Sequence, residues 1–385
     1  MREDWDIRLF KDVFDLQMGK TPDRKNFSLF EGDNTWVSIK DLDGKYISSS
    51  KECISDEAAK NIKLVKRGTV IMSFKLTVGK TAIAGKDLYT NEAIMAFNLR
   101  NGYDIDASFL YYYLKNYRWE GSNKAVMGIT LNKATISKHK IAIPPKPTQL
   151  SIVSELDKLN ELIQIKKEQL KDYDALAQSI FYEMFGDPVV NEKGWEVMSL
   201  GDICEITSSK RVFANEYVDM GVPFYRSKEV IEKSKQLPIS VELYISESHY
   251  DKIKSSFGVP QIGDILVTAV GTIGKIWVVD TNEPFYFKDG NLVWLRKIKG
   301  VHSEYFRYSL FYLIDEYKKV NANGAAYNAL TIAKLKLMLC PLPPLSLQQS
   351  FAHKIEQIER QKAAVQRTIK DLETLLAVRM QYWFE

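Results

Sequence analysis

GTVIMSFKLTVGKTAI, residues 68–83, decides the fold, because it recurs as GDILVTAVGTIGKIWV at residues 263–278. The two stretches align without a gap, and the pair Gly79-Lys80 falls on Gly274-Lys275. A repeat with so long a period fixes the architecture before any single helix or strand does. We therefore expect two copies of one structural unit.

Further matches extend the repeat on both sides of this stretch. The tripeptide WDI that begins at Trp5 recurs as WEV at Trp195, and the tripeptide IPP at Ile143 recurs as LPP at Leu342. Each proline pair is followed by a glutamine, Gln149 or Gln348 at the same spacing. The whole chain is thus one unit of roughly 190 residues written twice, with small insertions that we expect in loops.

A proline-rich hinge divides each copy, at residues 143–147 (IPPKP) and 341–344 (PLPP). Proline bars helix and forces an extended backbone on the residue before it. After each hinge, apolar residues follow a 4-3 spacing, which predicts a long helix with a heptad seam. The seam residues are Leu156, Leu159, Ile163, Leu170, Tyr173 and Ile180 in the first copy, and Ile355, Ile358, Val365, Ile369, Leu372 and Leu376 in the second.

Three basic residues interrupt these seams, namely Lys166, Lys362 and Arg379. A heptad seam needs a partner helix, and each copy supplies one to the other. We therefore expect an antiparallel coiled coil of two helices, each about 50 Å long. The alternative is a plain amphipathic helix packed on its own domain, although about 35 residues without internal Gly or Pro is long for such a helix.

A mixed segment precedes each hinge. Four runs read as strands, at residues 70–74, 94–99, 264–270 and 276–279. Residues 108–115 and 304–313 read as helices at matching places of the two copies. Both helices carry aromatic residues at helical spacing, which we expect in the core rather than on a platform for stacking bases.

The predicted fold class is α/β (α+β) modules plus long α-helices, with two tandem modules joined by the antiparallel coiled coil and related by a pseudo-twofold internal repeat. The topology of each module does not follow from the sequence. The chain divides into a first domain at residues 1–143, a hinge and helix at 144–186, a second domain at 187–341, and a second hinge and helix at 342–385.

Composition narrows the class of protein. The chain has 385 residues, a formal charge of only +4, four histidines and three scattered cysteines, Cys53, Cys204 and Cys340. This usage offers neither a zinc spacing nor a disulfide framework, and it fits a reducing cytoplasm. No stretch is apolar enough for a signal peptide or a membrane span, so we expect no membrane association.

Familiar catalytic motifs are missing. Gly79-Lys80-Thr81 imitates the end of a phosphate-binding loop, but Phe74 stands where that loop requires glycine, so we expect a tight turn between strands. The sequence has no Gly-x-Ser-x-Gly elbow, no Asn/Asp-Pro-Pro-aromatic tetrad and no histidine at a recurring position. These observations favour a binding protein without catalytic residues or a metal site.

Two related but non-identical modules on a pair of long helices suit an extended ligand with a repeat of tens of ångströms. A DNA helical turn of about 34 Å is the obvious candidate. Because the modules differ in sequence, the two half-sites should differ too.

The order of module, proline-rich hinge and long heptad helix ending in an aromatic, repeated once, resembles the specificity subunit of type I restriction–modification enzymes. The openings WDIRLFKDVFDLQMGKT at residues 5–21 and WVSIKDL at 36–42 are similar to the start of that family's target recognition domains. Residues 195–210 and FYRSKEV at 224–230 are a more diverged version. The resemblance covers essentially the whole chain.

This resemblance implies a subunit without enzymatic activity, whose two domains each read one half of a bipartite, asymmetric site in double-stranded DNA. The paired helices would set the spacing and dock two modification subunits. Those subunits would bring S-adenosylmethionine and methylate adenine. Restriction subunits, which use Mg²⁺ and ATP, would join the same assembly, and this chain itself would bind no cofactor.

Candidate DNA contacts are basic or amide residues in loops that both copies share. Lysine and arginine can reach phosphates or guanine edges, and amides suit adenine; the alternative for each is an ordinary solvated charge or turn former. Residues 1–143 carry 23 basic and 18 acidic residues, and residues 186–341 carry 19 of each, so the second reader must concentrate its charge on one face. The candidates are Lys20, Arg24, Lys25, Lys40, Lys80, Asn123 and Lys124 in the first copy, and Lys210, Arg211, Arg226, Lys228, Lys275, Asn323 and Asn328 in the second.

Two other classes of function stay open. The chain could be a self-contained DNA-modifying enzyme, in which case it would cut or methylate DNA alone. It could also be a coiled-coil adaptor that carries two protein-binding modules, in which case it would not retard DNA.

Overall fold

The computed structural model describes residues 4–119, 124–125, 128–129, 131–321 and 329–385. It divides into two compact units, one made of Met1–Glu168 and Gln366–Glu385 and the other of Gln169–Val365. Each unit thus combines one mixed module with a segment of each long helix. We call residues 4–143 module 1 and residues 187–341 module 2; the four sequence segments with their boundaries stay a prediction.

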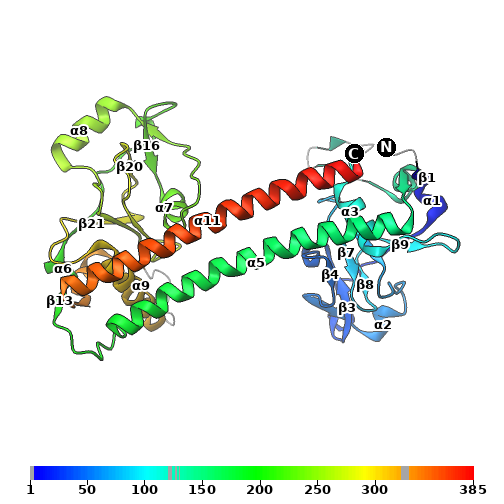
Figure 1. Ribbon diagram of the computed structural model, residues 1–385, viewed down its shortest axis with the longest axis horizontal. Coiled ribbons are helices and arrows are strands. Elements are labelled where there is room, and N and C mark those ends of the chain that lie inside the picture. The colour runs from blue at the N-terminus through cyan, green and yellow to red at the C-terminus, as the bar shows by residue number, and fades with distance from the viewer. Residues whose placement is uncertain (1–3, 120–123, 126–127, 130, 322–328) are drawn as a thin grey trace. The chain divides into compact units, whose positions relative to one another are not determined.

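Module 1 is built mainly from short strands (Figure 1). Its strands are β1 (Asp6–Leu9), β2 (Phe14–Met18), β3 (Asn34–Val37), β4 (Tyr46–Ile47), β5 (Glu52–Ile54), β6 (Val70–Ser73), β7 (Thr81–Ala84), β8 (Tyr89–Thr90), β9 (Ile94–Leu99), β10 (Lys124–Ala125), β11 (Gly128–Ile129) and β12 (Lys140–Ile143). Its helices are α1 (Phe10–Val13), α2 (Asp56–Ala59), α3 (Ala107–Asn116) and α4 (Lys133–Lys138), with short 3-10 turns η1 (Phe27–Phe30) and η2 (Ile39–Asp41).

Two sheets organise module 1. The large sheet has the order β2-β9-β6-β7-β4, and the small sheet has the order β5-β3-β8. Most neighbours are antiparallel, but β3 runs parallel to β8 and β4 runs parallel to β7. Strand β1 pairs with β12, which brings the start of the module beside its hinge.

Helix α3 covers the core of unit 1. Its residues Phe109 to Leu114 are all buried, and the Phe109 ring lies 6.3 Å from Trp5 and 5.8 Å from Phe384. These aromatic side chains are therefore core residues, as the sequence predicts, because their rings pack on both the large sheet and the long helices.

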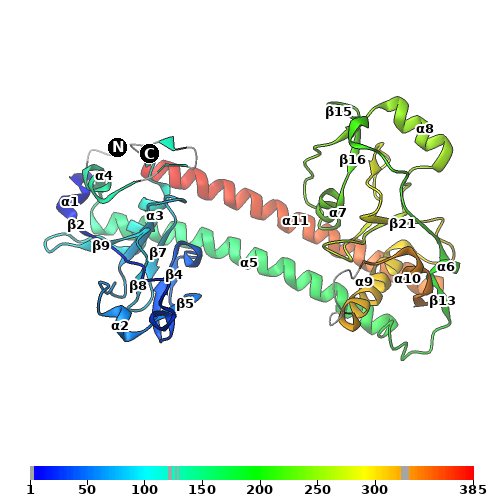
Figure 2. The same cartoon turned by 180° about the vertical axis from the view of Figure 1, so that it is seen from behind.

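Module 2 is built on a similar plan, and several of its strands and helices are labelled in the view from behind (Figure 2). Its strands are β13 (Val197–Ser199), β14 (Glu205–Thr207), β15 (Tyr217–Val218), β16 (Val222–Tyr225), β17 (Tyr244–Ile245), β18 (Ile265–Thr268), β19 (Ile276–Val278), β20 (Tyr286–Phe287), β21 (Leu292–Arg296) and β22 (Leu339–Pro341). Its helices are α6 (Leu200–Ile203), α7 (Ser227–Ser234), α8 (Glu247–Phe257), α9 (Ser303–Val320) and α10 (Ile332–Leu337), with a 3-10 turn η3 (Ala214–Glu216).

The topology confirms the duplication. The large sheet of module 2 has the order β14-β21-β18-β19 and its small sheet has the order β15-β17-β16-β20. The parallel pair β16–β20 corresponds to β3–β8, and β13–β22 corresponds to β1–β12. In the described part of module 2, no strand corresponds to β4. The predicted α/β modules with long helices are confirmed.

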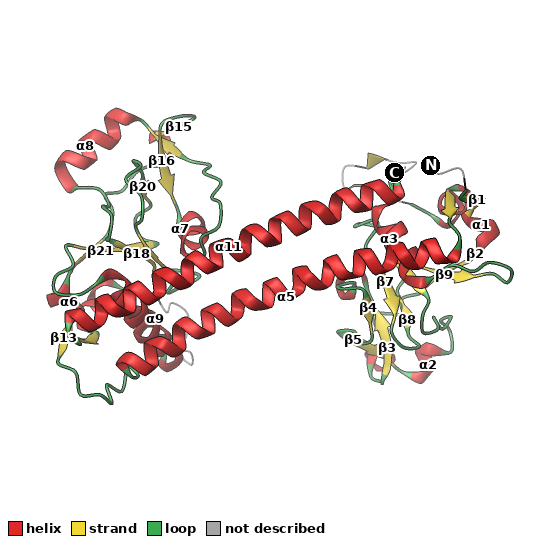
Figure 3. Ribbon diagram, viewed as in Figure 1, coloured by secondary structure: helices red, strands yellow, loops and turns green. Residues whose placement is uncertain are grey.

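The long helices are α5 (Lys146–Phe185) and α11 (Leu345–Phe384), each drawn as one uninterrupted helix in Figure 3. The first hinge is shorter than predicted, because Pro147 lies in the first turn of α5. Proline is tolerated there, since the N–H groups of a first turn have no partner within the helix. The second helix begins directly after Pro344, as expected.

A buried glutamine holds each hinge. The Gln149 amide donates to the carbonyl oxygens of Asp104 and Pro144, both at 3.0 Å, and its oxygen accepts from the Asp106 N–H at 2.8 Å. Gln348 repeats this with the Pro343 carbonyl and the His302 N–H, both at 2.8 Å. Asp106 and His302 cap α3 and α9, so the glutamines tie each module's helix to its hinge.

The helices pair in opposite directions within each unit. In unit 1, Arg379 is ion-paired with Glu155, and Lys167 lies 2.8 Å from Glu373. In unit 2, Lys362 lies 2.8 Å from Asp174 and 3.2 Å from Glu359. Two of the three basic residues that interrupt the seam are thus neutralised by acids of the partner helix, which makes their places in the seam tolerable.

Every predicted seam residue is covered at least in part. The buried ones are Leu156, Leu159, Ile163, Ile355, Ile358, Val365 and Ile369, and the half-buried ones are Leu170, Tyr173, Ile180, Leu372 and Leu376. Near the end of α5 the buried stripe shifts by one residue, to Phe181 and Phe185. Phe181 packs on Tyr305 of α9 at 5.8 Å and on Phe351 of α11 at 5.6 Å, so module 2 and the partner helix share it.

Candidate nucleic-acid interface

A turn with the same hydrogen bonds joins two large-sheet strands in each module. The Ser73 hydroxyl donates to the Thr77 carbonyl and accepts from the Lys80 N–H at 3.1 Å. In module 2, the Thr268 hydroxyl donates to the Thr272 carbonyl and accepts from the Lys275 N–H at 2.9 Å. The turn between strands that the sequence predicts is therefore confirmed, and it is built identically in both copies.

Glycine is required in this turn, because Gly79 and Gly274 have φ angles of +90° and +82°. The Lys80 side chain is exposed at the end of the turn. Lys275 instead lines a cavity of about 300 Å³ together with Arg307 and Asp174. These two lysines therefore share a backbone position and differ in their surroundings.

The loop after β2 is fixed to the small sheet of module 1. The Lys20 N–H donates to the Thr90 carbonyl at 2.9 Å, and the Trp36 indole N–H donates to the Lys20 carbonyl at 3.1 Å. A Cβ on Gly19 would lie 2.1 Å from the Thr90 oxygen, so only glycine fits. This close approach places the exposed Lys20 and Lys25 side chains beside the small sheet.

Arg24, in the same loop, is already engaged within the module. Its guanidinium makes two hydrogen bonds to Glu52 of β5, at 2.5 and 3.0 Å, and lies 4.4 Å from the Phe30 ring centroid. The bond from Arg24 holds the pKa of the Glu52 carboxyl below its usual value. Lys20, Lys25 and Lys40 form no ion pair with any residue that the structure describes.

The equivalent loop of module 2 is also fixed to its small sheet, with different partners. The Lys210 N–H donates to the Tyr286 hydroxyl at 2.6 Å, and the Lys210 ammonium lies 5.1 Å from the Phe257 ring centroid. Arg211 forms an ion pair with Asp289 at 2.7 Å, although its own side chain is largely exposed.

Lys40 and Lys228 occupy matching places in short helices that follow β3 and β16. In both helices a carboxylate accepts from the N–H of the residue that precedes the helix: Asp41 from Ser38 in module 1 and Glu229 from Arg226 in module 2, both at 2.8 Å. The contact in module 2 is charged, since Arg226 bonds the fully buried Glu229 at 2.8 Å. This bond raises the pKa of Arg226 above its ordinary value.

Glu242, from the segment between α7 and β17, binds the exposed side of the same group. One of its oxygens lies 2.9 Å from Arg226 and the other lies 2.6 Å from Lys228. The hydrogen bond from Lys228 is the main cause that lowers the pKa of Glu242. Both basic candidates of α7 are therefore neutralised in the folded chain.

The structure thus brings most basic candidates to the small sheet of each module. Lys80 and Lys275 lie instead on the turns of the large sheets. The candidates Asn123, Asn323 and Asn328 lie outside the described residues, and the side chain of Lys124 does too. The sequence did not reveal Glu52, Asp289 and Glu242 as partners, because each comes from a distant part of the chain.

The residues that the structure describes lack two kinds of feature. They hold no group of three His, Cys, Asp or Glu side chains that could bind a metal ion. None of the helices that they form has the length and apolar character needed to cross a membrane.

Comparisons with known proteins agree with this architecture. A family model described as type I restriction modification DNA specificity domain matches residues 2–172 and again residues 192–374. The type I restriction enzyme MjaIX specificity subunit of Methanocaldococcus jannaschii is 28% identical over 60% of this chain, and a type I restriction enzyme specificity subunit of Haemophilus influenzae is 28% identical over 66%. The matched parts span only 59% and 65% of these two relatives.

A solved structure supports the fold over the full length. A chain described in work on complex assembly and conformational transition of the type I R-M system is 20% identical, with a TM-score of 0.65. The match covers 100% of this chain and 98% of that chain.

Proposed function

This chain belongs to the family of the type I restriction modification DNA specificity domain, and from this premise we propose that each of its modules reads one half of a bipartite, asymmetric DNA site. The chain is the DNA sequence-recognition subunit of a type I restriction–modification system. One observation carries the proposal: the two modules share a backbone framework, yet the small sheet of each presents a different set of polar side chains.

The small sheets are the surfaces that we assign to DNA. Lys20, Lys25 and Lys40 lie there in module 1, and Lys210, Arg211 and Lys228 lie there in module 2. Phosphate contacts from such residues position a protein on the duplex, and contacts to base edges specify the sequence. Arg24 and Arg226 support these surfaces, because their guanidinium groups are bound to Glu52 and Glu229.

We assign two roles to the paired helices, which are to set the spacing of the half-sites and to dock two modification subunits. Apolar residues exposed on the helices support the second role. In unit 1 these include Leu162 and Ile165 of α5 and Leu375 and Val378 of α11. Such side chains are costly to leave in water along a helix and are typical of protein–protein contact.

The subunit has no enzymatic activity in this proposal and binds no cofactor. The modification subunits supply S-adenosylmethionine, and restriction subunits, where they join, use Mg²⁺ and ATP. The absence of a membrane partner and a cytoplasmic location belong to the same proposal.

An exchange of modules tests the proposal. Replacing residues 1–143 with the same segment of a related specificity subunit should change one half-site and leave the other intact. The chimera is assembled with its modification subunits, and methylated sites are identified by sequencing. If both half-sites change, the modules are not independent readers.

The same assembly separates the other classes of function. A self-contained enzyme would methylate or cut duplex DNA as the purified chain with S-adenosylmethionine and Mg²⁺. A coiled-coil adaptor would fail to retard DNA even with modification subunits present. We expect the purified chain to retard DNA without cutting or methylating it. We expect methylation only after the modification subunits are added.

A further inference from the structure

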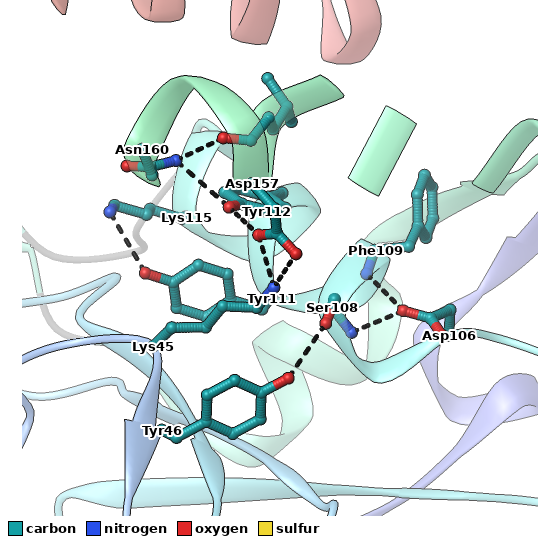
Figure 4. Close-up of polar contacts among 11 residues, drawn as sticks. Lys45, Tyr46, Asp106, Ser108, Phe109, Tyr111, Tyr112, Lys115, Asp157 and Asn160 are labelled. Carbon is teal, nitrogen blue, oxygen red and sulfur yellow. Dashed lines mark hydrogen bonds and ion pairs between the residues drawn. The ribbon is translucent and has the colours of Figure 1, made fainter. Parts of the chain in front are cut away.

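A polar cluster joins module 1 to helix α5 around one carboxylate (Figure 4). The Lys45 ammonium lies 2.6 and 2.7 Å from the two oxygens of Asp157. The Tyr112 hydroxyl donates to the same carboxylate, and the Asn160 amide donates to the Tyr112 hydroxyl at 3.2 Å. We call Lys45, Tyr112 and Asp157 the clamp.

The clamp connects three separate elements. The Lys45 carbonyl accepts from the Ile83 N–H at 2.8 Å, so its backbone belongs to the edge of the large sheet directly before β4. Tyr112 comes from α3, and Asp157 comes from α5, next to the buried seam residue Leu156. One carboxylate therefore fixes both the sheet and the covering helix of module 1 on α5.

The clamp is shielded from water on the side of the module. The Lys45 side chain is only 19% exposed, and Tyr112 is buried. Burial, reinforced by Asp157, raises the pKa of the Tyr112 hydroxyl well above its ordinary value, so the hydroxyl keeps its proton for this bond. The Asp157 side chain is 41% exposed, so water screens the ion pair on the other side. The geometry of the clamp is fixed by the ion pair together with the hydrogen bond from Tyr112.

Unit 2 has a different junction at the matching place. Counted from the hinge glutamines Gln149 and Gln348, Asp157 of α5 corresponds to Glu356 of α11, and Asn160 corresponds to Glu359. Glu356 pairs with Arg360 of its own helix at 2.6 Å. Glu359 accepts from the Gln236 amide at 2.8 Å and lies 3.2 Å from Lys362. No described residue of module 2 forms an ion pair with Glu356 or Glu359, so an ionic clamp at this place is specific to module 1.

We propose that the clamp is the positioning site that fixes module 1 on α5 and so sets how strictly the complex discriminates the length of the DNA spacer. This inference rests on the proposed function. DNA resists twisting and bending, so a reader held in one orientation accepts only the spacer that presents its half-site correctly. A reader free to tilt by a few degrees accepts neighbouring spacers. None of the clamp residues needs to touch a base.

The test uses the full chain assembled with its modification subunits and a plasmid library of the same half-sites with spacers of varied length. Lys45→Met and Asp157→Asn should leave the half-site bases unchanged. Each should lower the preference for the native spacer over spacers one base pair longer or shorter by about tenfold. Asp157→Asn is the milder variant, because its amide oxygen can still accept from Tyr112.

Two further variants keep the test specific. Lys66→Met is the matched control, since Lys66 pairs with Asp87 at 2.9 Å on the surface of the same module and touches no helix of the pair. It should keep the native spacer profile. The reversed pair, Lys45→Asp with Asp157→Lys, should restore part of the discrimination that either single change loses.

The outcomes separate this inference from the proposed function. If the native complex recognises no bipartite site, the proposed function fails. If it does, but Lys45→Met and Asp157→Asn keep the native spacer profile, the clamp does not position the module. A reversed pair no stricter than the single variants would equally overturn the inference.

Discussion

The two modules are closely similar in the turns of their large sheets and differ in the side-chain contacts of their small sheets. The turns match bond for bond, with a hydroxyl at Ser73 or Thr268 and a glycine at Gly79 or Gly274. The small sheets match only in backbone, because Lys40 forms no ion pair with a described residue and Lys228 is bound to Glu242. Duplication has thus kept the bonds that shape the modules and changed the charges that a ligand would meet.

The difference arises from a segment that folds differently in the two copies. In module 1, the segment after η2 forms β4 and extends the large sheet. In module 2, the matching segment instead carries Glu242 to Arg226 and Lys228. Module 2 has equal numbers of acidic and basic residues. Some of its acidic residues form ion pairs with its basic candidates.

The largest difference that we predict between the units concerns packing on the helices. Phe181→Ala should destabilise unit 2 by about 3–5 kcal/mol, because it removes a fully buried ring and leaves a cavity. Met380, the matching residue of α11, is a buried residue of the core of unit 1 with a flexible side chain, so Met380→Ala should fall at the lower end of about 2–5 kcal/mol. Calorimetric unfolding of the full chain measures both changes, and equal losses would show that the two junctions are packed equally well.

The next prediction tests the charge difference between the small sheets. Glu242→Gln releases Lys228 but leaves Arg226 bound to the buried Glu229, so DNA binding by the assembled complex should tighten about tenfold at low salt. Its dependence on salt should steepen by up to about 0.9 in the log–log slope, the value for one further phosphate contact. Titration at several salt concentrations measures both quantities.

Glu247→Gln is the control for this variant, since Glu247 is an exposed acid of module 2 with no ion pair to a described residue. It changes the net charge equally but should change affinity little. Weaker binding by Glu242→Gln would mean that Glu242 orients Arg226 and Lys228 for DNA rather than competing with it.

The smallest predicted difference concerns pH. Glu205 faces Arg296 across β14 and β21, where module 1 has Asp15 facing Asn98. Hydrogen bonds from Arg296 and Lys297 lower the pKa of Glu205 to about 2, against about 4.3 in an unfolded chain. The stabilisation is therefore complete above about pH 4.3 and is lost as the pH falls towards 2.

Its size should stay under about 1 kcal/mol, because the Glu205 side chain is 39% exposed and water screens the pair. Glu205→Gln should flatten the acid-side fall in the unfolding temperature of unit 2. Identical pH profiles for Glu205→Gln and the native chain would exclude this ion pair as a source of acid sensitivity.

Local patterns in the sequence were enough to predict the repeat, the long helices and the turn at Gly79. The predicted seam positions are off by one residue near Phe181. A straight helix drifts from a 3.5-residue repeat, and aromatic rings of module 2 pack against a different face of α5 there. The ion pairs could not be predicted, since Lys45 and Asp157 lie far apart in the chain and only the folded sheet brings them together. The DNA candidates stay a prediction, and Arg24 shows why: its sequence context does not reveal Glu52.

The buried glutamines of the hinges have a consequence for how such chains can be rebuilt. Among the residues that the structure describes, the side chains of Gln149 and Gln348 bond only main-chain atoms, namely carbonyl oxygens and the N–H groups of Asp106 and His302. Main-chain atoms are the same whatever the side chains are. We therefore expect this joint to accept a module with different side chains, provided that the backbone of the module ends in the same place.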